Sequence, residues 1–146
     1  MKLVLPTHSA LRRPAGLILQ RNVGNIAEAM WKVMYEAGGI GLAAPQVGLS
    51  IRLAVIDCEG FKDVLINPVI IKREGNRRCV EGCLSLPGHQ FAVYRSHRVC
   101  IEYTNLAGKR LKTRAGGNVL AQCFEHETDH LNGVLIDIGR RMGAVL

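Results

Sequence analysis

The stretch FEHETDHLNG, at positions 124–133, contains His126, Glu127 and His130 in the order H-E-x-x-H. Two histidines four residues apart lie on one face of a helix, so one nitrogen of each ring can bind the same metal ion. A glutamate between them can take a proton from a water molecule beside that ion. Two histidines do not complete such a site, so the pattern predicts a further ligand elsewhere in the chain.

The missing ligand is expected upstream of the helix. A third histidine ten residues after His126 would be needed for one known downstream pattern, and that position holds Ile136. Asp137 is the only acidic residue between there and Leu146. Apart from the scattered acids, the upstream candidates are Cys79, Cys83, His89 and His97.

Two kinds of metal site are compatible with these residues. If Cys79 and Cys83 both bind, they and the two histidines form a closed Cys2His2 zinc site, which would stabilise the fold without doing chemistry. If only one cysteine binds, a fourth position stays open for water. Glu127 favours the open site, because a closed structural site needs no proton carrier beside the metal.

The hydrophobic pattern predicts the elements that hold these residues. We expect a helix over 22–37, strands over 51–57, 64–72, 98–103 and 109–114, and a second helix over 119–131. Asn118 is the expected N-cap of that second helix, and Asn132 and Gly133 are expected to end it. The order predicts one α+β domain over 1–146, with an N-terminal helix and antiparallel strands packed around a central, C-terminal, metal-binding helix.

Within the second helix, the spacing places the histidines on an inward stripe. Val119, Cys123, His126 and His130 follow a 4, 3, 4 spacing, whereas Leu120, Phe124 and Leu131 face elsewhere. We therefore expect the histidine side chains to point into the protein.

Composition limits the classes of function. The chain has 146 residues, of which 48% are hydrophobic and 21% charged, as in a globular protein. The formal net charge is +7, but the basic residues are scattered, which predicts no specific nucleic-acid site and at most weak proximity to ribosomal RNA. The sequence has no apolar run long enough for a membrane span. Five irregularly spaced cysteines without a secretory signal favour a reducing cytoplasm over a disulfide framework.

Three motifs together resemble those of one enzyme family. GIGLAAPQ at 39–46, EGCLS at 81–85 and EHETDH at 125–130 are similar to the three signature motifs of peptide deformylases, in the same order. The resemblance covers nearly the whole chain, whereas H-E-x-x-H alone is weak evidence. It implies a metal-dependent hydrolase that removes the N-terminal formyl group from formyl-methionyl peptides of newly made proteins and releases formate.

The resemblance also implies the metal site and the group that moves protons. The metal ligands would be Cys83, His126 and His130, and Glu127 would be the general acid and base. The expected metal is Fe(II), with Ni, Co or Zn as substitutes, and water would take the fourth position. Cys79 would then be a neighbour and not a ligand.

Further roles follow from the same resemblance. The side-chain amide of Gln46 and the backbone N–H of Leu84 would stabilise negative charge on the formyl oxygen. Glu81 and Arg95 would pair and brace the cysteine loop. The substrate would contact Ile40, Gly41, Val119 and Cys123, with the backbone of Gly41 open to the extended peptide.

Three features depart from the family pattern. Glu125 replaces the usual Gln before the first histidine, and it could change the basicity of the site or face solvent. Gln122 stands where an aliphatic residue is expected, which weakens the expectation of strict methionine preference. The chain ends at Leu146, so we expect a short form without the long C-terminal helix that many bacterial members use against the ribosome. An inactive deformylase-like scaffold is a further alternative.

Overall fold

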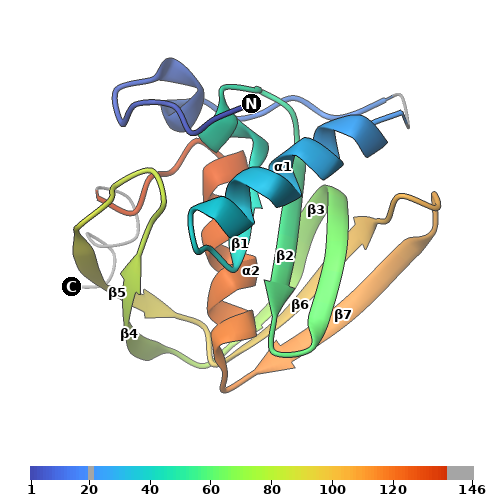
Figure 1. The fold of residues 1–146 in the computed structure, drawn as a ribbon. Helices are drawn as coiled ribbons and strands as arrows, with labels where there is room; N and C mark the ends of the chain where they lie inside the picture. Colours follow the sequence, from blue (N-terminus) through green and yellow to red (C-terminus); the bar gives the residue numbers. More distant parts are fainter. Residues whose placement is uncertain (20–21, 138–146) are drawn as a thin grey trace.

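Helix α2 (Val119–Leu131) runs between a five-stranded and a two-stranded antiparallel sheet in the computed structural model, which describes residues 1–19 and 22–137 (Figure 1). The larger sheet has the strand order β1-β2-β3-β6-β7, and the smaller pairs β4 with β5. The strands are β1 (Gly41–Ala43), β2 (Leu53–Cys58), β3 (Phe61–Glu74), β4 (Arg77–Gly82), β5 (Gln90–Arg95), β6 (Arg98–Thr104) and β7 (Arg110–Gly116). The remaining elements are α1 (Gly24–Glu36) and the 3-10 turns η1 (Ser9–Arg12) and η2 (Ala44–Val47).

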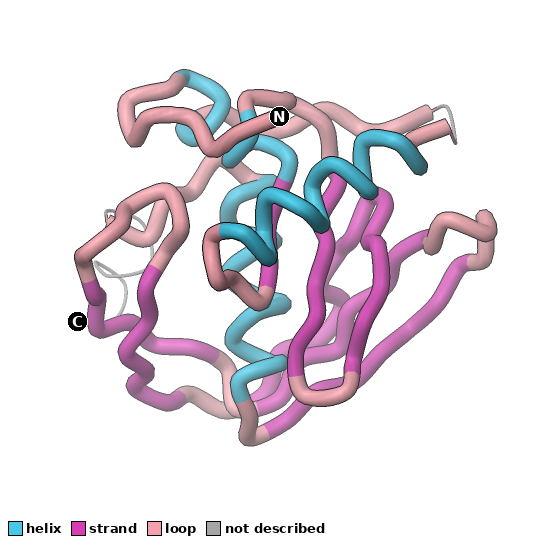
Figure 2. Tube along the Cα trace, viewed as in Figure 1, coloured by secondary structure: helices cyan, strands magenta, loops and turns pink. Residues whose placement is uncertain are grey.

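Strand β2, the second in the large sheet, explains why the two helices lie on opposite faces of that sheet. Leu53 and Val55 point into the core beneath α1, while Ala54 and Ile56 belong to the core beneath α2. Successive side chains of a strand point to opposite faces, so a strand that is apolar throughout is covered on both sides. Figure 2 shows the two helices in cyan, with the strands of the large sheet in magenta.

The α+β fold predicted from the sequence is confirmed, and the long elements lie close to their expected bounds. Helix α1 and strands β2, β6 and β7 differ from prediction by at most two residues at either end, while β3 is longer than expected. Strands β1, β4 and β5 were not predicted. Strand β1 has only three residues, and the buried faces of β4 and β5 include the charged residues Glu81 and Arg95, so their hydrophobic signal is weak.

Helix α2 is buried on two sides, as the predicted stripe requires. Leu120, Phe124 and Leu131 pack into the core against the large sheet. His130 on the predicted stripe is also buried, whereas Val119 at the start of the helix is 43% exposed. The predicted N-cap is confirmed, since Asn118 accepts a hydrogen bond from the backbone N–H of Ala121.

The end of α2 is held by Gly133, which has a φ of +74°. Its N–H donates to the carbonyl of His130, and the N–H of Val134 donates to that of Asp129, the paired bonds of a Schellman motif. A Cβ at Gly133 would lie 2.5 Å from the carbonyl carbon of Arg13. Glycine is therefore needed both for the backbone angle and for close contact with the N-terminal segment.

The described residues contain no helix that is both long and apolar enough to cross a membrane. The expectation of a short form depends on the end of the chain, and residues 138–146 lie outside the described part. The assignment of 1–146 to one domain remains a prediction.

Gly133→Ala should destabilise the protein more than Gly60→Ala. Both positions have a positive φ, but a Cβ at Gly60 meets nothing within 4 Å. Gly60→Ala should therefore lower the free energy of unfolding by about 1 kcal/mol for backbone strain alone. Gly133→Ala adds a clash with backbone atoms and should cost at least about 3 kcal/mol in urea unfolding. Equal losses would show that the contact with Arg13 contributes nothing.

Candidate active site

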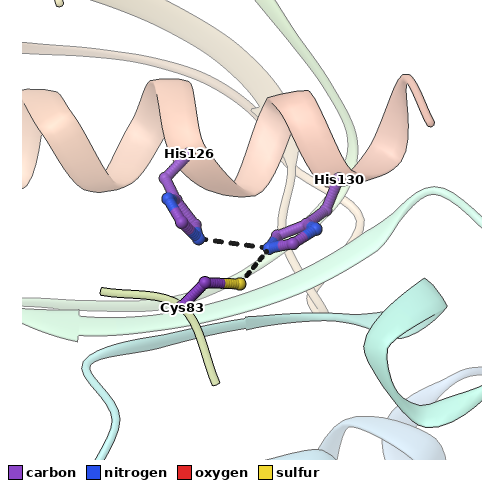
Figure 3. A group of neighbouring side chains, drawn as sticks. All are labelled: Cys83, His126 and His130. Carbon is purple, nitrogen blue, oxygen red and sulfur yellow. Dashed lines mark hydrogen bonds between the residues drawn. The ribbon is translucent and has the colours of Figure 1, made fainter. Parts of the chain in front are cut away.

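Three side chains meet beside α2 in an arrangement suited to a metal ion (Figure 3). His126 and His130 project from one face of the helix toward Cys83, which follows β4. The Nε2 atoms of the two rings are 3.1 Å apart, and His130 Nε2 lies 3.3 Å from Cys83 Sγ. All three ligand atoms lie within 4.8 Å of one another. The structure thus brings together the three predicted ligands.

The donor set fits a divalent metal. Two ligands bound at about 2.0–2.3 Å to one tetrahedral ion lie roughly 3.4–3.6 Å apart. The 3.1 Å between the two rings and the 3.3 Å between His130 and Cys83 are close to that separation. A thiolate with two imidazoles suits Fe, Co, Ni or Zn, so the donor atoms do not select one metal. Only three protein ligands converge among the described residues, which fits a catalytic site with an open position better than a closed one.

Glu81 and Arg95 hold His126 in place from the side away from Cys83. Glu81 Oε1 lies 3.1 Å from His126 Nδ1, and Arg95 donates to both oxygens of Glu81 at 2.7 and 2.8 Å. Arg95 also donates to Asp129 at 2.7 Å, although its side chain is only 1% exposed. A carboxylate that accepts a hydrogen bond from Nδ1–H keeps the proton on that nitrogen and leaves Nε2 free to bind a metal. The predicted pairing of Glu81 with Arg95 is present.

Charge balance in this group favours a positive charge at the ligand site. Burial opposes ionisation of Glu81, but the hydrogen bonds from Arg95 and His126 outweigh it and lower the pKa of Glu81 to about 2. Burial also acts against a charge on His126, yet its contacts with Cys83 and Glu81 raise its pKa to about 10 in the metal-free protein. Burial and the neighbouring His126 lower the pKa of His130. The groups around His126 would stabilise a cation in the same way.

Glu127 follows His126 on α2, lines the cavity and is 4% exposed. Its Oε2 has no hydrogen-bond partner within the described part of the chain. Burial raises the pKa of Glu127 to about 7 in the metal-free protein, and a bound cation would lower it again. A carboxyl group with a pKa in this range can both accept and return a proton near neutral pH.

Gly41 is required by the position of Glu127. A Cβ at Gly41 would lie 2.5 Å from Glu127 Oε1 and 2.7 Å from Cys123 Sγ. A Cβ there would force the carboxylate of Glu127 and the sulfur of Cys123 to move, because real Cβ contacts are not that short. Glycine at this position in β1 therefore allows the carboxylate to lie directly against the sheet edge.

Gln46 is buried in η2 and points its amide toward the ligand loop. Its Oε1 accepts a hydrogen bond from the N–H of Ala43 at 2.8 Å. Its Nε2 lies 3.1 Å from Ser85 Oγ and 3.8 Å from Cys83 Sγ. The amide donor is therefore directed to the same side as the metal ligands. The contact with Ser85 was not predicted, although Ser85 belongs to one of the motifs.

A cavity of about 880 Å³ opens onto these residues. Ten of the twelve predicted site residues line it, and His130 and Arg95 are the two that do not. Ile40 and Val119, both more than 40% exposed, lie where the cavity meets solvent. The ten are Ile40, Gly41, Gln46, Glu81, Cys83, Leu84, Val119, Cys123, His126 and Glu127. Sequence reasoning missed the further apolar lining residues Leu3, Val80, Leu86 and Pro87.

Cys79 lies away from the ligands, which disfavours the closed Cys2His2 site. It shares a small buried cluster with Cys83, Val93, Leu135 and Ile136, but its sulfur is not among the ligand atoms that converge with the histidines. Strand β4 is extended between Cys79 and Gly82, so the Cα atoms of Cys79 and Cys83 are separated by about 13 Å. Two cysteine sulfurs bound to one zinc ion at about 2.3 Å each cannot span that distance. All five cysteines are described, and all are free.

The two unusual residues of α2 take different positions. Glu125 does not face solvent, since it is fully buried and accepts hydrogen bonds from the backbone and hydroxyl of Ser96 and from Arg73. It thereby ties α2 to the turn between β5 and β6. Gln122 lines the cavity, as its position in the sequence suggested.

Cys83→Ser should lower bound cobalt far more than Cys79→Ser. Cys83 supplies the sulfur that converges with the two histidines, whereas the sulfur of Cys79 is outside that group. The Cys79 variant should keep about one Co(II) per chain and its sulfur-to-cobalt absorption band, and the Cys83 variant should lose that band. Equal loss of metal in the two variants would indicate that both cysteines bind the metal, as in the closed Cys2His2 zinc site.

The comparisons with known proteins agree on one family. Residues 1–139 match the family model described as "Polypeptide deformylase". A protein named peptide deformylase from Halothermothrix orenii is 46% identical over 123 residues, which cover 82% of this chain and 79% of the relative.

Solved structures give the same result. A peptide deformylase from Synechococcus elongatus, crystallised with actinonin, is 42% identical, with a TM-score of 0.87 over 92% of this chain and 75% of that one. The PDF of the Vibrio parahaemolyticus bacteriophage VP16T, also with actinonin, is 36% identical, with a TM-score of 0.88 over 93% of this chain and 100% of that one. Sequence and fold therefore point to the same relatives.

Proposed function

The chain belongs to the peptide deformylase family, and we propose that it removes the N-terminal formyl group from formyl-methionyl peptides of newly made proteins. The observation that carries this proposal is the meeting of Cys83, His126 and His130 beside a buried Glu127 in one cavity. A hydrolase of a linear amide needs these parts, namely an open metal position, a proton carrier and room for the substrate.

In the proposed reaction, three residues hold the metal and Glu127 transfers the proton. A divalent metal held by Cys83, His126 and His130 would act as a Lewis acid and lower the pKa of a bound water molecule. Glu127 takes a proton from the attacking water, whose oxygen forms a bond to the formyl carbon. Glu127 then gives that proton to the amine nitrogen as the carbon–nitrogen bond breaks. The products are formate and a peptide with a free N-terminus.

Charge that develops on the formyl oxygen needs donors aimed at it. We assign this role to the Nε2 hydrogen of Gln46 that faces Cys83 and to the backbone N–H of Leu84. The position of Gln46 Nε2, 3.8 Å from Cys83 Sγ, supports the assignment because the oxygen must lie beside the metal ligands. Burial of Gln46 strengthens such a donor, since water does not compete for it.

The substrate is assigned to the cavity that opens onto these residues. Ile40, Val119 and Cys123 would contact the methionine side chain, and the backbone of Gly41 would pair with the extended peptide. This is supported by the cavity lining and by the place of β1 at the edge of the large sheet, where one side of the strand has no neighbouring strand in the described sheet.

The finer assignments are also proposals. Fe(II) is the proposed physiological metal, supported by a donor set that it shares with Co, Ni and Zn. We place the protein in the cytoplasm, where formylated chains are made, with weak proximity to the ribosome. The net charge of +7 supports that proximity through its attraction to polyanions.

Glu127→Gln should abolish formate release from formyl-Met-Ala-Ser while the bound metal is retained. The amide keeps the shape of the carboxylate but cannot take a proton, and general acid–base catalysis contributes about 10²–10⁴-fold. Wild type and variant should be loaded with Ni(II) under anaerobic conditions and compared for kcat and metal content. The matched control is Glu28→Gln, an exposed residue of α1, which should keep full activity.

The acetylated peptide serves as the substrate control and should not be cleaved at a comparable rate. Failure of metal-loaded wild type to release formate would contradict the proposed reaction. Full activity in Glu127→Gln would leave the reaction standing but remove Glu127 as the proton carrier.

A further inference from the structure

The carboxamide of Gln46 is held in a single orientation by its surroundings. The torsion that rotates a glutamine amide has broad minima, so the side chain itself does not fix where the N–H groups point. Ala43 N–H donates to Oε1 at 2.8 Å, which turns Nε2 toward the ligand loop. Gln46 is 1% exposed, so water does not replace these contacts.

Ser85 provides the second contact that fixes this amide. Its Oγ lies 3.1 Å from Gln46 Nε2, and its side chain is 2% exposed. A primary amide carries two hydrogens in one plane. If Ser85 accepts one of them, the other is directed toward Cys83 Sγ, 3.8 Å from Nε2, at the side of the metal ligands.

We propose that Ser85 is a positioning residue, whose hydroxyl accepts one hydrogen of the Gln46 amide and so holds the other on the formyl oxygen. This inference rests on the proposed function. It gives the serine that follows Cys83 and Leu84 a role in the reaction that is exerted through Gln46.

The alternative is that Ser85 only shapes the loop that carries Cys83. That loop is short, and the N–H of Leu86 donates to the carbonyl of Cys83 at 2.9 Å. A purely structural serine would affect metal binding when removed. A serine that orients Gln46 would affect kcat and leave the metal in place, because the Cys83 thiolate and both histidines keep their positions.

The test compares Ser85→Ala, Ser85→Thr, Gln46→Ala and the double variant Ser85→Ala/Gln46→Ala, all loaded with Ni(II). Ser85→Ala should lower kcat about 10-fold with little change in KM and unchanged metal content. Threonine keeps the hydroxyl and should recover most of the activity. The double variant should be no slower than Gln46→Ala alone. Ser50→Ala, at an exposed serine, is the matched control and should match wild type.

Hydrogen exchange of the glutamine side-chain amides gives a readout that does not depend on turnover. In zinc-loaded protein labelled with ¹⁵N-glutamine, the Gln46 amide should exchange more slowly than that of the exposed Gln90, and Ser85→Ala should speed its exchange at least 10-fold. The Gln46→Ala spectrum assigns the signal.

Three results would overturn the role of Ser85. These are full kcat in Ser85→Ala, a further loss of the same size on the Gln46→Ala background, and unchanged exchange of the Gln46 amide in Ser85→Ala. Inactive wild type would contradict the proposed function instead, and the exchange comparison would still decide whether Ser85 holds the amide.

Discussion

The buried guanidinium of Arg95 connects the two parts of the protein that supply the metal ligands. Cys83 follows the small sheet, whereas both histidines come from α2, and Arg95 at the end of β5 binds Glu81 on β4 and Asp129 on α2. Removing one partner of a buried ion pair typically costs about 3–5 kcal/mol, because the other charge is left without compensation. The distance between Cys83 and the two rings therefore depends on this group.

The same group also sets the chemistry of His126. Glu81 contacts Arg95 with both oxygens and His126 with one of them, so the carboxylate stays ionised while buried. An ionised Glu81 fixes the orientation of the ring and directs Nε2 toward Cys83. Glu125, the residue before His126, also fixes α2 because it accepts hydrogen bonds from the backbone and hydroxyl of Ser96. The carboxylate of Glu125, next to the ligand His126, thus holds α2 in place and does not line the cavity.

Much of this arrangement was predictable because its signals are local. Helix α2 has a stripe of spaced residues, an asparagine cap and a glycine stop, and each of these acts within a few residues of the chain. The metal ligands were accessible by combining that helix with the EGCLS motif. The choice between Cys79 and Cys83 was left open by spacing alone. Recognition of β4 would have resolved it, because an extended chain separates the two sulfurs.

Other features depend on contacts that no local pattern reveals. The helix pattern alone would predict that Asp129 faces solvent. In the structure, Arg95, which lies 34 positions earlier, donates a hydrogen bond to it. Ser85 meets Gln46 across 39 positions, and Gly41 meets Glu127 only because β1 lies against α2. Strand β1 has three residues, and β4 and β5 bury charged side chains, so their periodicity does not stand out although they line part of the cavity. The motifs therefore identify the chemistry, whereas the tertiary fold identifies what holds it in place.

X-ray absorption at the metal edge of zinc-loaded protein tests the central claim most directly. An open site held by Cys83, His126 and His130 predicts one sulfur at about 2.3 Å, two nitrogens at about 2.0–2.1 Å and one further light ligand from solvent. The light ligand should change when formate is added, because that position faces the cavity. Two sulfurs with two nitrogens, unaffected by formate, would contradict the account and indicate a closed structural site.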